Sequence, residues 1–224
     1  MEKSEKQKYF IVQNIAKETM IFLKNEVTSG MTEIDIRSIA EDKLLELGAD
    51  SFWYYNVGAL VLIGERTIIS KSGKNYKATT MKIKKNDIVT VDLSPALGGY
   101  WGDYARTIIV GDRKIFQKGF DFENYLHQYF RKVISPEISM GELFDSVNRV
   151  IDENGYQNLD FNKNLGHTIE KKKEARKYFE SGNAIKIKEI QYFTFEPHIR
   201  YKNDKYGYKM ENIYYFADGR LKEL

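Results

Sequence analysis

The sequence predicts an α+β fold composed of two similar halves. Each half contains a capped amphipathic helix that ends in glycine, and the two segments read MTEIDIRSIAEDKLLELG at 31–48 and MGELFDSVNRVIDENG at 140–155. Residues that favour strands, β-branched and aromatic, follow each of these helices. Helices followed by strands, twice in tandem, predict an internal pseudo-two-fold with the functional site at the seam between two sheets.

The chain has 224 residues, of which 42% are hydrophobic, so it is long enough to bury one core. It contains only three prolines and has no linker-like segment, and we therefore expect a single domain over 1–224. The first residues carry charges of both signs, and the longest apolar stretch, 57–63, is far shorter than a membrane span. We expect a soluble, cytoplasmic protein.

In the first half, apolar spacing predicts a helix over 5–25 and a second over 32–47, where Thr32 followed by Asp35 is a variant capping signal. The composition of 51–70 predicts a strand pair. Alternation then predicts a half-buried hairpin with arms at 88–93 and 104–110.

The second half repeats this order. Residues 115–134 are expected to be helical, and Ser139 with Glu142 forms a capping box before the next helix, which ends at Gly155. Further strands are predicted at 192–196, 199–201 and 210–216.

The charge and the cysteine count exclude several classes of function. Thirty-five basic and thirty-two acidic residues leave a net charge of +3, which predicts neither nucleic-acid binding nor attraction to a membrane surface. The absence of cysteine excludes disulfides, thiolate metal sites and a cysteine nucleophile. With three histidines, His127, His167 and His198, a metal site would be built mainly from carboxylates.

Asp92 and Asp103 lie on the two arms of the predicted hairpin, in VDLSPALGGYWGDYARTIIVG, where they could converge on one hard cation. The simpler interpretation is that they are solvated turn or capping groups. His167 in NLGHTIE is alternatively a packing histidine. Glu196 in FTFEPHI and Glu211 in KMENIYYF interrupt apolar strands, where an unpaired carboxylate is costly to bury unless it faces outward.

Taken in order, these five residues resemble the ligand set of the pita-bread metallohydrolases, which include methionine aminopeptidase, aminopeptidase P, prolidase and creatinase. The resemblance runs from about residue 84 to the C-terminus, and GYWGDYARTIIVG, EPHI and the final MENIYYFADGRLKEL are most similar to aminopeptidase P and prolidase. It implies a pita-bread fold, with a curved antiparallel sheet flanked by helices. It also implies a metal site formed by Asp92, Asp103, His167, Glu196 and Glu211.

The resemblance further implies a dinuclear hydrolase similar to Xaa-Pro aminopeptidase, which cleaves an N-terminal peptide bond with metal-bound hydroxide. Two divalent ions would bind, and this oxygen-rich ligand set favours manganese, iron or cobalt over zinc. Glu196 would also be catalytic, as the proton shuttle. We expect a small peptide or small molecule as substrate, no nucleic-acid or membrane partner, and compatibility with a homodimer.

Two histidines of the family pattern are absent. Before Asp92, where a substrate-contacting histidine is normal, Ser70 or Lys71 lies nearest, and Glu174 falls near the position of a second one after His167. His198 could substitute for one of them, and Arg106 is a further candidate for substrate contact. The N-terminal domain of aminopeptidase P and prolidase is also not expected in this chain. Two alternatives therefore stay open: a metal-dependent enzyme acting on a non-peptide molecule, and a non-catalytic binding module.

Overall fold

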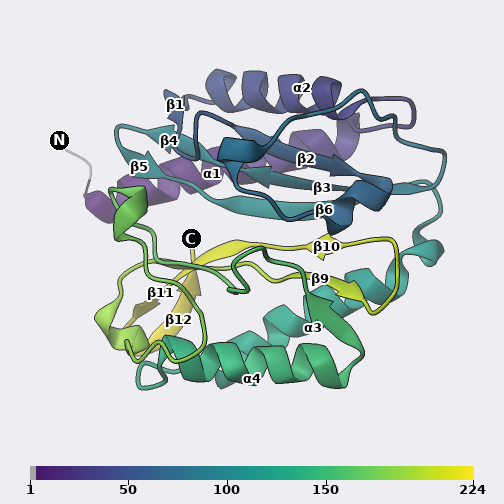
Figure 1. The fold of residues 1–224 in the computed structure, drawn as a ribbon. Coiled ribbons are helices and arrows are strands. Elements are labelled where there is room, and N and C mark those ends of the chain that lie inside the picture. The colour runs from purple at the N-terminus through teal and green to yellow at the C-terminus, as the bar shows by residue number, and fades with distance from the viewer. Residues whose placement is uncertain (1–3) are drawn as a thin grey trace.

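Helices cover the two outer faces of the molecule and the strands lie between them (Figure 1). The computed structural model describes residues 4–224. Helices α1 (Glu5–Glu26) and α2 (Glu33–Glu46) pack on the strands of the first half, and α3 (Gln117–Val133) and α4 (Met140–Glu153) pack on those of the second. The predicted α+β architecture with two similar halves is confirmed.

Both predicted helix caps are present as reciprocal hydrogen bonds. The Thr32 hydroxyl accepts from the Asp35 backbone N–H at 3.1 Å, and the Asp35 carboxylate accepts from the Thr32 N–H at 2.9 Å. Ser139 and Glu142 make the same pair of bonds at 3.1 and 2.8 Å. Each cap stabilises its helix by about 1 kcal/mol and fixes where the helix begins.

In the first half, β3 (Asp87–Leu93) pairs antiparallel with β6 (Tyr104–Val110), as predicted, and β2 (Ala59–Ile63) pairs with the other edge of β3. Two strands, β1 (Ser51–Phe52) and β2, lie within 51–70 as predicted, but they do not pair with each other. Strand β1 instead joins a second small sheet with β4 (Pro95–Leu97) and β5 (Tyr100–Trp101). The connection between β3 and β6 is therefore a further pair of strands, not a tight turn.

The second half contains two three-stranded antiparallel sheets, of order β10-β9-β7 and β12-β11-β8. Their strands are β7 (Tyr156–Asn158), β8 (Phe193–Phe195), β9 (His198–Tyr201), β10 (Tyr208–Lys209), β11 (Asn212–Ala217) and β12 (Arg220–Glu223). Short 3-10 helices lie at Gly64–Ile68, Gly73–Asn75, Arg113–Ile115, Lys173–Ala175 and Ile187–Glu189. None of the helices found between residues 4 and 224 is long and apolar enough to span a bilayer.

The two halves meet along β6. The backbone N–H of Glu211 donates to the Ala105 carbonyl at 3.0 Å, and the Lys209 N–H donates to the Thr107 hydroxyl at 2.9 Å. The half-buried Arg106 guanidinium donates to the carbonyls of both Ala105, at 2.7 Å, and Glu211, at 2.6 Å. The seam is thus closed by hydrogen bonds to the main chain, and each half keeps its own apolar core on the helix side.

Candidate metal centre

Asp92 and Asp103 come from the strand pair at the centre of the first half. Asp92 lies in β3 opposite Ala105, two residues from Asp103, so the two carboxylates lie on one side of the sheet as diagonal neighbours. Asp103 immediately precedes β6 and is fixed by α1: its N–H donates to the buried Gln13 side chain at 2.9 Å, and the Gln13 amide donates back to its carbonyl at 2.8 Å.

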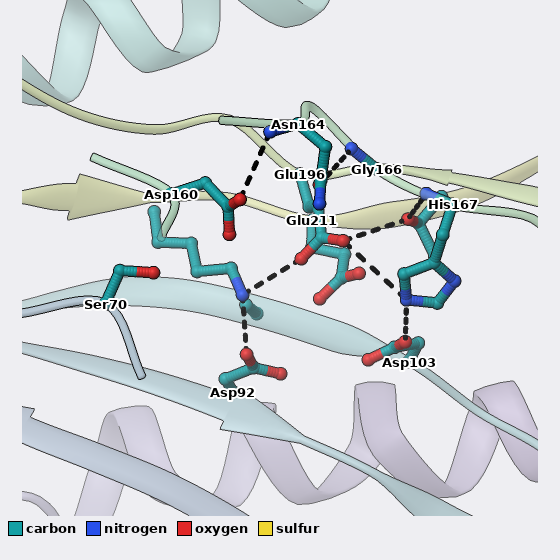
Figure 2. Close-up of polar contacts among 12 residues, drawn as sticks. Ser70, Asp92, Asp103, Asp160, Asn164, Gly166, His167, Glu196 and Glu211 are labelled. Carbon is teal, nitrogen blue, oxygen red and sulfur yellow. Dashed lines mark hydrogen bonds and ion pairs between the residues drawn. The ribbon is translucent and has the colours of Figure 1, made fainter. Parts of the chain in front are cut away.

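Three side chains of the second half approach these aspartates from the opposite side (Figure 2). Glu196 directly follows β8, and Glu211 directly precedes β11. His167 is held beside β8 by two hydrogen bonds. Its N–H donates to the Thr194 hydroxyl at 3.1 Å, and its carbonyl accepts from the Thr194 N–H at 2.8 Å. The carboxylates therefore lie at strand ends instead of interrupting strands, and the seam brings all five predicted residues together.

Asp103, His167 and Glu211 form the tightest group. Each offers one ligand atom, and these atoms lie within 4.8 Å of one another. The His167 Nε2 is 3.5 Å from Asp103 Oδ2 and 3.7 Å from Glu196 Oε1. Both Glu211 carboxylate oxygens are completely buried and accept no hydrogen bond from any residue between Ser4 and Leu224.

Burial and neighbouring carboxylates disfavour the charged forms of Asp103 and Glu211 in the triad formed by Asp103, His167 and Glu211. Burial, together with nearby Asp92 and Glu196, raises the pKa of Asp103 to about 6, although His167 acts in the other direction. Burial and the neighbouring Asp103 raise the pKa of Glu211 well above its ordinary value. A buried carboxylate with no partner is costly, and a cation between the two would remove that cost.

The orientation of His167 also suits a metal ligand. Its Nδ1 is 3.0 Å from the Thr168 carbonyl, which is a hydrogen-bond acceptor, so Nδ1 carries a proton and Nε2 is the ring nitrogen that faces Asp103. A deprotonated imidazole nitrogen and carboxylate oxygens that face one another would fit a divalent cation. Asp103, His167 and Glu211 thus form a group that could bind one.

Asp92 and Glu196 share a partner that was not predicted from the sequence, Lys209. The Lys209 ammonium lies 2.5 Å from Asp92 Oδ2 and 3.1 Å from Glu196 Oε2. Burial would raise the pKa of Glu196, but Lys209 and His167 outweigh it and hold that pKa below its ordinary value. The signal was present in the sequence: Lys209 stands two residues before Glu211, and such neighbours point to one side of an extended chain.

These groups open into a cavity of about 230 Å³. Asp92, Asp103, His167, Glu196 and Lys209 line its floor. Its walls are aromatic and basic, and they are formed by Trp53, Tyr54, Tyr55, Lys71, Arg176 and Tyr178. The guanidinium carbon of Arg176 lies 5.3 Å from the ring centre of Trp53 and 5.4 Å from that of Tyr178. Arg176, from the basic segment 171–177, thus contributes one wall residue.

Four residues were predicted as substrate contacts: Ser70, Glu174, His198 and Arg106. Of these, only Ser70 lines the cavity, beside its alternative Lys71. The Ser70 hydroxyl accepts from the Phe161 N–H at 3.1 Å. Glu174 is exposed and lies outside the lining, because Arg176 takes the inward position of its segment. His198 does not line the cavity either. It is buried, its Nε2 lies 2.7 Å from the Thr67 carbonyl, and burial lowers its pKa to about 4.

Arg106 is the third candidate that the structure places elsewhere, since its guanidinium is committed to the seam. Besides the two carbonyls, it donates to Asn212 Oδ1 at 2.6 Å and lies 3.8 Å from the Tyr104 ring centre. His127 is likewise away from the cavity. It is buried on α3, with Nε2 3.1 Å from the Met210 carbonyl.

Gly166 sets the position of His167, and we expect Gly166→Ala to disturb the metal centre. Its φ is +143°, and a Cβ atom there would lie 2.4 Å from the Thr194 carbonyl oxygen. The expected loss is about 2–4 kcal/mol of unfolding free energy, with weaker Mn²⁺ binding, measured by urea unfolding and calorimetry. Gly182→Ala is the control, because its φ is +77° with nothing within 4 Å. Equal losses in both variants would contradict the role given to Gly166.

Comparison with known proteins relates this chain to peptidases. The sequence model of metallopeptidase family M24 matches residues 7–218. An Xaa-Pro dipeptidase of Pyrococcus horikoshii is 28% identical over 171 residues, which cover 75% of this chain and 46% of the relative. A methionine aminopeptidase of Staphylococcus epidermidis is 24% identical over 189 residues, covering 79% and 72%. The chain spans about half the length, or less, of several curated relatives it matches.

Solved structures share the fold. The prolidase from Pyrococcus furiosus superposes with a TM-score of 0.85 at 21% identity, covering 99% of this chain and 64% of the prolidase. The methionine aminopeptidase from Rickettsia prowazekii gives 0.77 at 17% identity, with 100% and 98% covered. The fold is therefore the pita-bread fold, as the resemblance implied. Because the family's sequence model matches almost the whole length, this chain belongs to metallopeptidase family M24.

Proposed function

We propose that this chain is a metal-dependent hydrolase that removes the first amino acid from short peptides, in the manner of an Xaa-Pro aminopeptidase. The observation that carries the proposal is the completely buried, unpartnered carboxylate of Glu211 beside Asp103 and His167. Such a group is an unstable arrangement by itself and a strong ligand set for a divalent ion. Manganese, iron or cobalt would suit its two carboxylates and one imidazole better than zinc.

Asp103, His167 and Glu211 would hold the ion. When bound, a divalent ion lowers the pKa of water and polarises the scissile carbonyl. A second ion, for which the five predicted ligands suffice, would have to bind Asp92 and Glu196, which now pair with Lys209.

Glu196 is placed to move the proton. Its Oε2 accepts from Lys209, while Oε1 stays on the side of the triad, 3.7 Å from His167 Nε2. Because its pKa is held below the ordinary value, Glu196 is ionised at neutral pH and can accept a proton from the attacking water. We propose that it then passes this proton to the leaving nitrogen.

The cavity fits a short peptide with free ends. The acidic floor favours a substrate ammonium, whereas Arg176 and Lys71 on the walls favour a carboxylate. Trp53 and Tyr54 offer flat apolar faces for a side chain or a proline ring. A volume of about 230 Å³ is below the ~300–1,000 Å³ that is typical of pockets for larger ligands. These features favour dipeptides and tripeptides over long chains.

The proposal is tested with the purified protein, first stripped of metal and then loaded with Mn²⁺ or Co²⁺. We expect release of the first amino acid from Xaa-Pro or Met-Xaa peptides, and a KM about tenfold higher for C-terminal amides, which lose the charge that Arg176 binds. Chromatographic detection of the free amino acid gives both values, and the stripped protein is the control. Absence of turnover on every peptide would contradict the proposal and would favour a non-peptide substrate.

A further inference from the structure

We infer that Lys209 provides a fixed positive charge in the place of a second metal ion, so that this chain holds one divalent ion, at Asp103, His167 and Glu211. The inference rests on the proposed function in that it requires the triad to bind metal. It concerns the other half of the acidic cluster, where Asp92 and Glu196 face the ammonium (Figure 2).

The two halves of the cluster differ in what they lack. Asp92 and Glu196 each have a charged partner, at 2.5 and 3.1 Å from Lys209 Nζ. Glu211, by contrast, has no partner at either carboxylate oxygen among residues 4–224. One half of the cluster thus contains an unpaired carboxylate among the described residues, whereas the other half already contains a cation, Lys209.

The ammonium also occupies the space that a second ion would need. A metal–carboxylate bond is about 2.0–2.2 Å long, so an ion bonded to both Asp92 Oδ2 and Glu196 Oε2 would lie between these atoms. Lys209 Nζ lies within hydrogen-bond distance of both. A second ion would thus have to displace the ammonium and would also be repelled by it.

Lys209 is not a surface side chain that can swing away freely. Its N–H donates to the Thr107 hydroxyl at 2.9 Å, and that hydroxyl donates to the Lys209 carbonyl at 3.1 Å. Its Cα pairs with that of His198 between β10 and β9, and its side chain is only 16% exposed. The backbone on both sides of the residue is therefore fixed by the seam, and the ammonium is directed into the cluster.

Metal stoichiometry tests the inference without reference to activity. The metal-free wild-type protein, Lys209→Met and Lys209→Arg are titrated with Mn²⁺ by calorimetry, and bound Mn²⁺ is examined by electron paramagnetic resonance, which distinguishes isolated ions from coupled pairs. We expect one ion per chain and an uncoupled spectrum for the wild type and for Lys209→Arg. Lys209→Met should bind a second ion about 100-fold or more tightly than the wild type does, and should show a coupled pair.

Lys205→Met is the matched control. Lys205 belongs to the same segment and pairs with Glu65 at 3.3 Å, but both side chains are exposed. It should behave as the wild type. Two ions of similar affinity in the wild type would overturn the inference, as would one ion in a folded Lys209→Met. If that variant does not fold, the wild-type stoichiometry still decides. A wild type that binds no Mn²⁺ would overturn the proposed function, and this inference with it.

Discussion

Replacing Asp103 by alanine is expected to remove metal binding and hydrolysis together. Asp103 is 4% exposed, and its carboxylate offers one of three ligand atoms, with those of His167 and Glu211, that lie within 4.8 Å of one another. Loss of this ligand leaves two, which do not fix a divalent ion in one geometry. We expect the metal content after gel filtration to fall to background and kcat/KM for a peptide to fall about 10³-fold or more.

Asp152→Ala is the control for this variant. Asp152 lies at the end of α4, its side chain is 74% exposed, and its carboxylate pairs with Lys202 at 2.6 Å. It should keep both metal and activity. An Asp103→Ala protein that loses metal but still cleaves peptides would show that the hydrolysis does not depend on this centre.

Replacing Glu211 by glutamine is expected to have opposite effects on the stability of the metal-free protein and of the metal-loaded protein. Burial and Asp103 raise the pKa of Glu211 well above its ordinary value, so the folded state holds this proton more tightly than the unfolded state. The free energy of unfolding therefore decreases as the pH rises above about 4.5, because the unfolded state loses the proton first. Glutamine carries no such charge, and its amide can donate to Asp103.

In the presence of a chelator, we expect Glu211→Gln to gain little over the wild type at pH 5 and about 1–3 kcal/mol at pH 8, measured by urea unfolding. His127 and His198, whose pKa values burial lowers to about 3 and about 4, give the opposite slope with pH. Because both proteins contain them, their contribution cancels in the comparison. With saturating Mn²⁺ the wild type should be the more stable protein. An advantage that did not change with pH would show that the buried charge is not its source.

The elements that could be predicted from the sequence are those determined by residues close together in the chain. The helices at Glu5–Glu26 and Met140–Glu153 follow from apolar spacing and caps within the segment itself. The pairing of β3 with β6 follows from two alternating segments close together in the chain. The partner of β1, by contrast, lies more than forty residues away in β4, and no pattern within 51–70 specifies it.

The candidate site shows the same division. Its five predicted residues were found through the order of motifs, and the structure places them at one seam. Lys209 was missed although its spacing of two residues from Glu211 places both on one side of an extended chain. Arg176 was missed because an arginine in a charged segment has no distinguishing neighbour pattern. Only the packing of β10 against β6, and of the segment around Arg176 against Trp53, directs them inward.

Backbone hydrogen bonds across the seam fix the spacing of the candidate ligands. Asp103 immediately precedes β6, and the backbone N–H of Glu211 donates to the carbonyl of Ala105 on that strand. The gap between the two carboxylates is thus set by main-chain hydrogen bonds and by one guanidinium, not by the side chains that cover the outer helices. For protein engineering, this means that many solvent-facing residues of α2 and α4 can be substituted together while the ligand spacing is retained.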